Sequence, residues 1–289
     1  MSDADLFAPA DPLERTVAPE RVNYATGVLL QAEDFRDEQT YHRGRLAMAM
    51  RHLAGFGTIA GLRVRAPEAE DNELEIHVDP GLALDRYGRL IELAEPYCIR
   101  LARWFAAQEP ERLKAAIQLK PRTPLNVAVV ADVFLSARDC GRGKTPSFGS
   151  GPFDALDAVV PARLAEAPQL ELVLRAEGPP GDIPTPKNHW PAPGADRDTQ
   201  LTAVLGAWDV GLSGGLDEGL DPLAEHVPGN NLSAVLLARI AIPVTAPAGK
   251  APALDLTKRT RVDNGLRPFI FLPGKWLGRA AAAAPLVEP

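Results

Sequence analysis

The segment Gly141–Thr145 is the first place where residue types and spacing match a known chemistry. Its Gly-Lys-Thr ending is that of a phosphate-binding loop, in which backbone N–H groups surround the phosphates and the lysine contacts them. The motif also needs a glycine where Arg138 stands, and a helix directly afterwards, which Pro146 and the glycines beyond it disfavour. We therefore interpret residues 141–145 as an exposed basic loop, not a nucleotide site.

A second segment, Gly211–Gly215, has the Gly-x-Ser-x-Gly pattern of a hydrolase nucleophile, and Asp221 and His226 follow in the order of a catalytic triad. That chemistry requires a buried strand before the serine and an unbroken helix after it. The preceding apolar stretch is too short, and further glycines would interrupt the helix. We interpret the segment as a flexible turn.

Two pairs of side chains have spacings that could serve a metal. Glu38 and His42 stand four residues apart on an expected helix, and His77 and Asp79 alternate with apolar residues on an expected strand. Neither pair has a second histidine or a usable cysteine nearby in the sequence. We expect a surface ion pair for the first and an ordinary half-exposed strand face for the second.

The cysteines and tryptophans are the remaining candidate functional residues. Cys98 and Cys140 are too few for a four-cysteine zinc site, and we interpret both as unreactive small apolar residues. The tryptophans are scattered, and Trp190 and Trp276 are the candidate interface residues. We expect no catalytic, cofactor-binding or metal-binding residue, and therefore no enzyme.

The net charge and the distribution of apolar residues exclude further classes of protein. A net charge of −7, from 31 basic and 38 acidic side chains, argues against nucleic-acid binding, which needs a concentrated basic face. There is no apolar run of the roughly 20 residues that a membrane span requires, and no basic and apolar opening of a signal peptide. The expectation is cytoplasmic synthesis without a signal peptide and no transmembrane segment.

One long helix is the strongest element in the pattern. From residue 32 to 53, apolar side chains recur at three- and four-residue steps, with acidic residues early and basic residues late, as the helix dipole favours. We expect Phe35 and Leu46 to pack this helix onto the rest of the protein, and Gly55 to Gly57 to end it.

The remaining chain is predicted to form β-strands and loops. Strands are expected at residues 58–64, 125–135, 169–174 and 234–244, and within 74–93, where Pro80-Gly81 and a turn at 85–88 interrupt them. Short helices are expected at 110–119 and 196–208. The 28 prolines and 24 glycines concentrate partly in long expected loops at 136–161 and 178–195. The predicted class is α+β: an N-terminal helix with short β-hairpins, then a β-rich region with long Pro/Gly-rich loops.

The predicted organisation is an extended arm at 1–23, a helix and hairpin module at 24–105, the β-rich region at 106–279 and a low-complexity tail at 280–289.

The stretch from Tyr24 to Leu93 resembles bacterial proteins of phage-tail-like contractile injection systems, and the opening of certain phage tail and baseplate proteins. The resemblance lies in a Tyr-x-x-Gly-x-Leu-Leu opening, an Asp-Phe helix and a Pro-Gly-x-Ala-x-Asp-x-x-Gly hairpin. Its fold-defining residues here are Tyr24, Gly27, Phe35, Gly57, Pro80, Gly81, Asp85 and Gly88.

The resemblance implies a structural role rather than a reaction. The expected protein is a structural or adaptor subunit, baseplate or tail associated, of a released or membrane-docked particle, with other particle subunits as partners and homo-oligomer formation left open. The alternative is an accessory protein that binds or acts on envelope carbohydrate, for which Trp190 and the acidic residues 68–73 are the only support.

Overall fold

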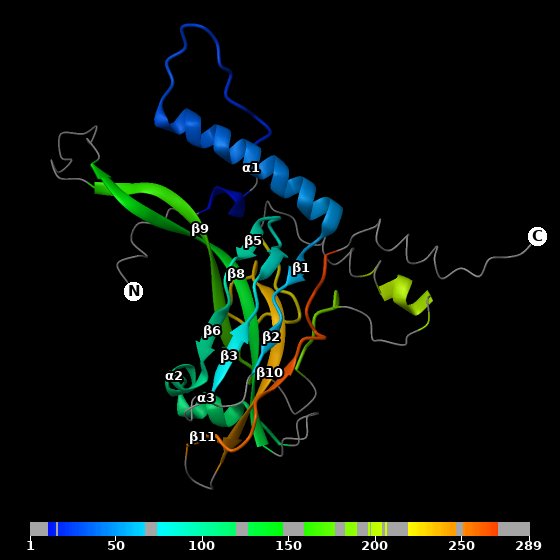
Figure 1. Ribbon diagram of the computed structural model, residues 1–289. Helices are drawn as coiled ribbons and strands as arrows, with labels where there is room; N and C mark the ends of the chain where they lie inside the picture. The colour runs from blue at the N-terminus through cyan, green and yellow to red at the C-terminus, as the bar shows by residue number, and fades with distance from the viewer. Residues whose placement is uncertain are drawn as a thin grey trace, which may run out of the picture.

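The computed structural model describes most of the chain (Figure 1): residues 11–15, 17–66, 74–119, 127–146, 159–176, 183–189, 196, 198–203, 206, 219–246 and 251–270. Antiparallel strands dominate, and one long helix lies across one end of them. The predicted α+β class with a long N-terminal helix is confirmed. The predicted tail at 280–289 and most of the expected loop at 178–195 lie outside the described residues.

The strands form three antiparallel sheets. Two of them have three strands each: β1 (Gly57–Gly61), β4 (Gly81–Leu84) and β5 (Leu90–Leu93), and β2 (Val64–Arg65), β3 (Glu75–Val78) and β6 (Tyr97–Arg100). The third is built on β7 (Ile117–Leu119), β8 (Val127–Pro146), β9 (Val159–Leu174), β10 (Val235–Thr245), β11 (Ala253–Leu254) and β12 (Arg261–Asp263). The strands expected at 125–135, 169–174 and 234–244 are therefore confirmed within β8, β9 and β10.

The short helices lie at the end of the molecule opposite to α1 (Figure 1). They are α2 (Leu101–Ala106) and α3 (Pro110–Ala115), and a 3₁₀ turn, η1 (Pro12–Glu14), precedes α1. The helix expected at 110–119 is right only in its first half, because Ile117–Leu119 pairs with β8 as a strand. Of the helix expected at 196–208, residues 198–203 and 206 are helical in the described part. Among the described helices, none is long and apolar enough to cross a membrane.

Helix α1 (Ala32–Ala54) begins and ends where its sequence predicts. The Asp34 carboxylate accepts a hydrogen bond from the backbone N–H of Gln31 at 2.7 Å, which satisfies one of the unpaired donors at the helix start. Gly55 ends the helix at a φ of 72°, a conformation that favours glycine.

The packing face predicted for α1 is wrong. Phe35 is 53% exposed and Leu46 is 65% exposed, whereas the buried residues are Ala47, Arg51 and Ala54. Small side chains let the helix backbone approach the β4–β5 turn so closely that a methyl group at Gly88 would overlap the carbonyl oxygen of Ala47. Close approach, rather than insertion of large apolar side chains, holds this helix in place.

The main hydrophobic core joins the small sheets to the large one. Residues of β3, β4, β5, β8 and β10 meet in one cluster, and its fully buried members include Ile76, Ala83, Val133 and Ile240. Alternation along β3 places Ile76 and Val78 inside and Glu75 and His77 outside, as predicted for this strand.

The expected loop at 136–161 is largely a β-hairpin. β8 continues to Pro146 and β9 begins at Val159, with a register that runs from Ser136 opposite Gln169 to Pro146 opposite Val159. Residues 147–158 lie outside the described residues. The paired backbone satisfies its hydrogen bonds along this ladder, and Pro161 and Pro168 are accommodated because β9 pairs with no described strand other than β8.

Glycines of the resembled motif are placed by close contacts as well as by turns. Gly88 sits in the β4–β5 turn at a φ of 86°. A methyl group on Gly81 would overlap the carbonyl oxygen of Ala60 on the neighbouring strand, and one on Gly57 would lie 2.6 Å from the carbonyl carbon of Pro268. The strand expected at 58–64 is divided because Leu62 turns the chain with a φ of 55°.

Candidate functional site

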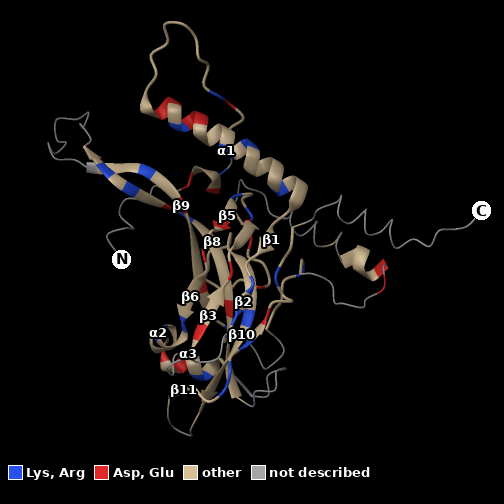
Figure 2. Cartoon of the chain, viewed as in Figure 1, with Lys and Arg blue, Asp and Glu red and all other residues tan. Residues whose placement is uncertain are grey.

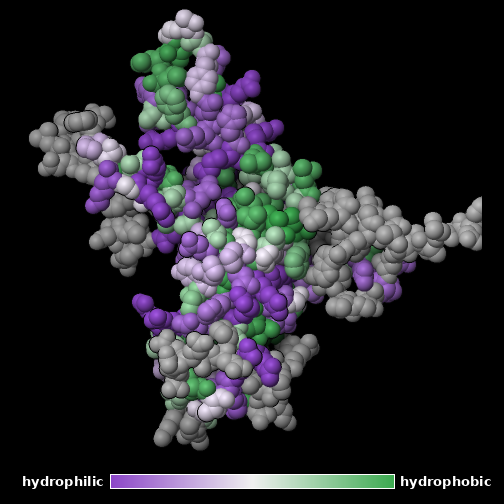
Figure 3. Space-filling model, in the orientation of Figure 1, coloured by the Kyte–Doolittle hydropathy of each residue, from purple (hydrophilic) through white to green (hydrophobic). Residues whose placement is uncertain are grey.

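Helix α1 presents an exposed apolar stripe that nothing in the described chain covers. Its members are separated by alternating steps of four and three residues, and we call them the α1 stripe: Phe35, Gln39, His42, Leu46, Ala49 and Leu53. Leu53 is 69% exposed, and the start of the helix with the loop before it shows hydrophobic surface (Figure 3). The stripe is about a third of a turn away from the buried Ala47, since each helical residue rotates about 100°.

Part of the predicted N-terminal arm is bound to its own chain. Leu13 is buried, and the Asp11 carboxylate lies 3.3 Å from Nη2 of Arg43 on α1 and 2.9 Å from Nη1 of Arg89 after the β4–β5 turn. Burial opposes ionisation of Asp11, but the hydrogen bonds from Arg89 and the Leu13 N–H lower its pKa below the usual value. This ion network fastens the arm, the helix and the hairpin together.

The far part of the β8–β9 hairpin is a second projection, seen extending away from the body (Figure 1). We call residues 137–146 and 159–168 the hairpin extension. Its exposed basic side chains are Arg138, Arg142, Lys144 and Arg163. The first half of α1 has the opposite charge, with Glu33, Asp34, Asp37 and Glu38, and both charge groups are visible in Figure 2.

The segment Gly141–Thr145 lies in this extension. It is a paired strand, with Gly141 opposite Leu164 and Thr145 opposite Val160, so the loop expected for these residues is wrong. The expected surface ion pair between Glu38 and His42 is confirmed, with Oε1 and Nε2 3.5 Å apart.

His226 is buried and structural. Its Nδ1 accepts a hydrogen bond from the Leu223 N–H at 3.1 Å, its Nε2 lies 3.3 Å from the carbonyl oxygen of Ala234, and its ring stacks on Phe134. Burial lowers the pKa of His226 to about 4. The Gly211–Gly215 segment of the hydrolase-like pattern lies outside the described residues.

A buried ion network in the large sheet was missed by sequence reasoning. Asp132 on β8 is fully buried and accepts hydrogen bonds from Arg175 at 2.6 Å and from Nε of Arg239 at 2.7 Å. Arg175 is 1% exposed and also donates to the carbonyl oxygen of Glu225 at 2.8 Å. The signal was a single charge within each apolar run, Asp132 in β8 and Arg239 in β10.

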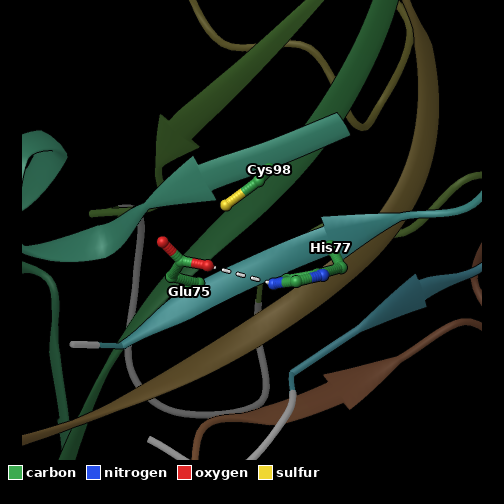
Figure 4. Close-up of side chains that lie close together, drawn as sticks. All are labelled: Glu75, His77 and Cys98. Carbon is green, nitrogen blue, oxygen red and sulfur yellow. Dashed lines mark hydrogen bonds and ion pairs between the residues drawn. The ribbon is translucent and has the colours of Figure 1, made fainter. Parts of the chain in front are cut away.

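Three potential metal ligands meet on the outer face of β3 and β6. Glu75 and His77 are two residues apart on β3, and Cys98 stands opposite His77 on β6. Figure 4 shows the three side chains directed toward one another. Cys98 is exposed and Cys140 is half-buried, so Cys98 is not the buried apolar residue that we expected.

The other predicted residues are dispersed. Tyr24 is 53% exposed, and Gly27 forms a turn at a φ of 86° with open space around it. Asp85 is buried and accepts hydrogen bonds from the backbone N–H groups of Tyr87 and Arg89, which shapes the β4–β5 turn. Pro80 lies just before β4 and its carbonyl oxygen accepts a hydrogen bond from the Leu62 N–H. The candidate interface residues Trp190 and Trp276 lie outside the described residues.

Searches with this chain against protein-family models and against curated proteins find no match.

Proposed function

We propose that this protein is a non-enzymatic structural or adaptor subunit of a phage-tail-like contractile injection particle, baseplate or tail associated. The observation that carries the proposal is the exposed α1 stripe, together with the sequence resemblance of residues 24–93. Phe35, Leu46 and Leu53 are all more than half exposed, although each is a large apolar side chain. Large exposed apolar side chains grouped on one helix face are typical of a surface that another protein covers.

The spacing of the α1 stripe suits a helical partner. Four of the six positions in this four-and-three repeat are apolar, and Gln39 and His42 stand between Phe35 and Leu46. Side chains of a second helix fit between residues that are spaced in this way. The buried face of α1 is occupied by its own chain through Ala47, Arg51 and Ala54, so the stripe is left for a neighbour. A particle subunit that presents a helix of its own is the partner that this geometry favours.

Helix α1 and the hairpin extension also favour contacts between subunits. The first half of α1 is acidic and the hairpin extension is basic, so the two surfaces are complementary in charge. When complementary patches lie at different places on one chain, contacts between copies are head-to-tail and build rings or stacks. Copies of this chain are therefore included among the proposed partners.

The deciding experiment is co-purification with sheath and tube proteins from cells that assemble particles. We expect the wild-type protein in the particle fraction, and a Leu46→Gln/Leu53→Gln variant to be recovered there about tenfold less, because interface anchors carry much of the binding energy. The matched control is Met48→Gln, which changes a residue that is 39% exposed outside the stripe.

Two results would contradict the proposal. One is a wild-type protein that stays in the soluble monomer fraction throughout particle assembly. The other is a double variant that enters particles as well as the wild type. The carbohydrate alternative depends on Trp190 and the acidic residues 68–73, which lie outside the described residues, and no observation in the described part of the chain favours it.

A further inference from the structure

The cluster of Glu75, His77 and Cys98 brings three different ligand types to one point on the surface. Their ligand atoms, a carboxylate oxygen, an imidazole nitrogen and the thiol sulfur, all lie within 4.8 Å of one another. The arrangement is fixed by the backbone: Glu75 and His77 share the outer face of β3, and the β3–β6 register places Cys98 opposite His77. Figure 4 shows Glu75 and His77 on one strand and Cys98 on the strand beside it.

The charges in this cluster favour a cation. Hydrogen bonds from Cys98 and from His77 lower the pKa of Glu75, so its carboxylate is ionised at neutral pH. Oε2 of Glu75 lies 3.1 Å from Nε2 of His77, which directs both ligand atoms to the same point. On the other side of the carboxylate, Nε of Arg100 lies 3.5 Å from Oε1 and holds that oxygen away from the point.

We propose that Glu75, His77 and Cys98 form a binding site for a divalent zinc ion. Thiolate, imidazole and carboxylate are the three ligand types that zinc takes in proteins, and three protein ligands leave a fourth tetrahedral position for water. A zinc ion with one thiolate and one carboxylate has no net charge, so Arg100 does not oppose its binding. The inference is independent of the proposed role in particle assembly.

Access to the site is open. A cavity of about 950 Å³ lies beside it, and its lining includes Glu75 and Cys98, Leu172 and Val173 of β9, and the basic residues Arg100, Arg103 and Arg112. Cys98 is exposed and the side chain of His77 is 39% exposed. An ion and its bound water can therefore enter without a change in the fold.

Binding involves a proton. The Cys98 thiol that is hydrogen-bonded to Glu75 loses its proton to solvent as the sulfur–zinc bond forms, and neither oxidation nor reduction occurs.

The first test uses cobalt(II), a spectroscopic substitute for zinc, with the purified full chain. We expect one equivalent of cobalt to give a thiolate-to-cobalt charge-transfer absorption that added zinc removes. A Cys98→Ser variant should lack this absorption, and the control Cys140→Ser, which changes the other free cysteine, should retain it. No charge-transfer absorption in the wild type, or an absorption that persists in Cys98→Ser, would overturn the proposal.

The second test measures alkylation of Cys98 by iodoacetamide, with zinc as the probe and mass spectrometry as the readout. Zinc should slow the alkylation of Cys98. The variants Glu75→Gln and His77→Ala should raise the zinc concentration that is needed for this protection by about tenfold or more. The matched control is His42→Ala, because His42 and Glu38 form a His–Glu pair on α1 without a cysteine. Unchanged alkylation with zinc, or an equal effect of His42→Ala, would contradict the site.

Discussion

The two halves of strand β8 are in contrasting environments although they belong to one continuous ladder. From residue 128 to 136 every residue is buried, whereas from 137 to 146 every residue is half-buried or exposed. The inner half has neighbours on both sides, β10 and β9, and the outer half is paired only with β9 in the described chain. The inner half holds the molecule together, whereas the outer half is held by pairing with β9 and by few side-chain contacts, such as the ion pair of Glu166 on β9 with Arg43 on α1.

Charge has a different function in each half. Asp132 in the inner half is fully buried between Arg175 and Arg239, so its removal would take away the carboxylate that both guanidiniums bind. Asp139 in the outer half is partly exposed and lies near the charges of Asp11, Arg43 and Arg89. The same residue type is therefore structural at one position and nearly neutral for stability seven residues later.

The largest effect is expected from Asp132→Ala. We expect it to lower the free energy of unfolding by about 3–5 kcal/mol, because breaking a buried ion pair leaves an uncompensated charge. Asp139→Ala, the matched change in the outer half, should cost about 0.5 kcal/mol or less. Urea unfolding followed by circular dichroism measures both, and similar losses for the two variants would remove the distinction between the halves.

Truncation of an apolar side chain is expected to give a smaller difference in stability between the two halves. Leu135 in the inner half is fully buried and Leu164, on β9 opposite the outer half, is 53% exposed. Leu135→Ala should destabilise by about 2–5 kcal/mol through lost burial and a residual cavity. Leu164→Ala should change stability by about 0.5 kcal/mol at most. A loss for Leu164→Ala as large as that for Leu135→Ala would show that the hairpin extension has a core of its own.

The smallest effect concerns pH and tests the inner half through His226, whose ring stacks on Phe134 of β8. Its pKa is lowered to about 4 in the folded protein from 6.5, so below pH 6.5 the unfolded chain binds more protons. This histidine should therefore cost about 2 kcal/mol of stability as the pH falls from 7 to 5.

The control for this prediction is His226→Leu, measured by urea unfolding at both pH values. The variant is expected to be less stable overall, because the Leu223 N–H loses its acceptor, but less sensitive to pH between 7 and 5. An equal pH dependence in the wild type and the variant would rule out His226 as its source.

Sequence patterns predicted the buried strands and the existence of α1 well. They predicted the packing face of α1 and the hairpin extension poorly, for a physical reason. Continuous apolar runs in β8 and β10 indicate burial whatever their partners are, and α1 was found from its periodicity and capping residues. Phe35 and Leu46 were assigned to the core because periodicity locates an apolar face without saying what covers it. Small residues, Ala47 and Gly88, made the contact instead.

The hairpin extension and the Glu75 cluster were missed because both depend on register. Glycines and prolines in residues 136–146 indicate a loop locally, and only pairing with β9 makes them a strand. Likewise, Cys98 lies far from His77 in the sequence, and the β3–β6 pairing alone brings the three ligand atoms together. Such long-range pairings are not encoded in local composition.

The prolines of β9 also limit how the molecule can associate. Pro161 and Pro168 lie in a strand with no described partner on its far side, and a proline cannot donate the backbone hydrogen bond that an added strand needs. Arg163 and Glu166 add charge along the same edge. The β9 edge of the protruding ribbon is thereby protected against edge-to-edge aggregation and strand exchange at high local concentrations. Neighbouring molecules that approach this edge must recognise its side chains, and not extend its sheet.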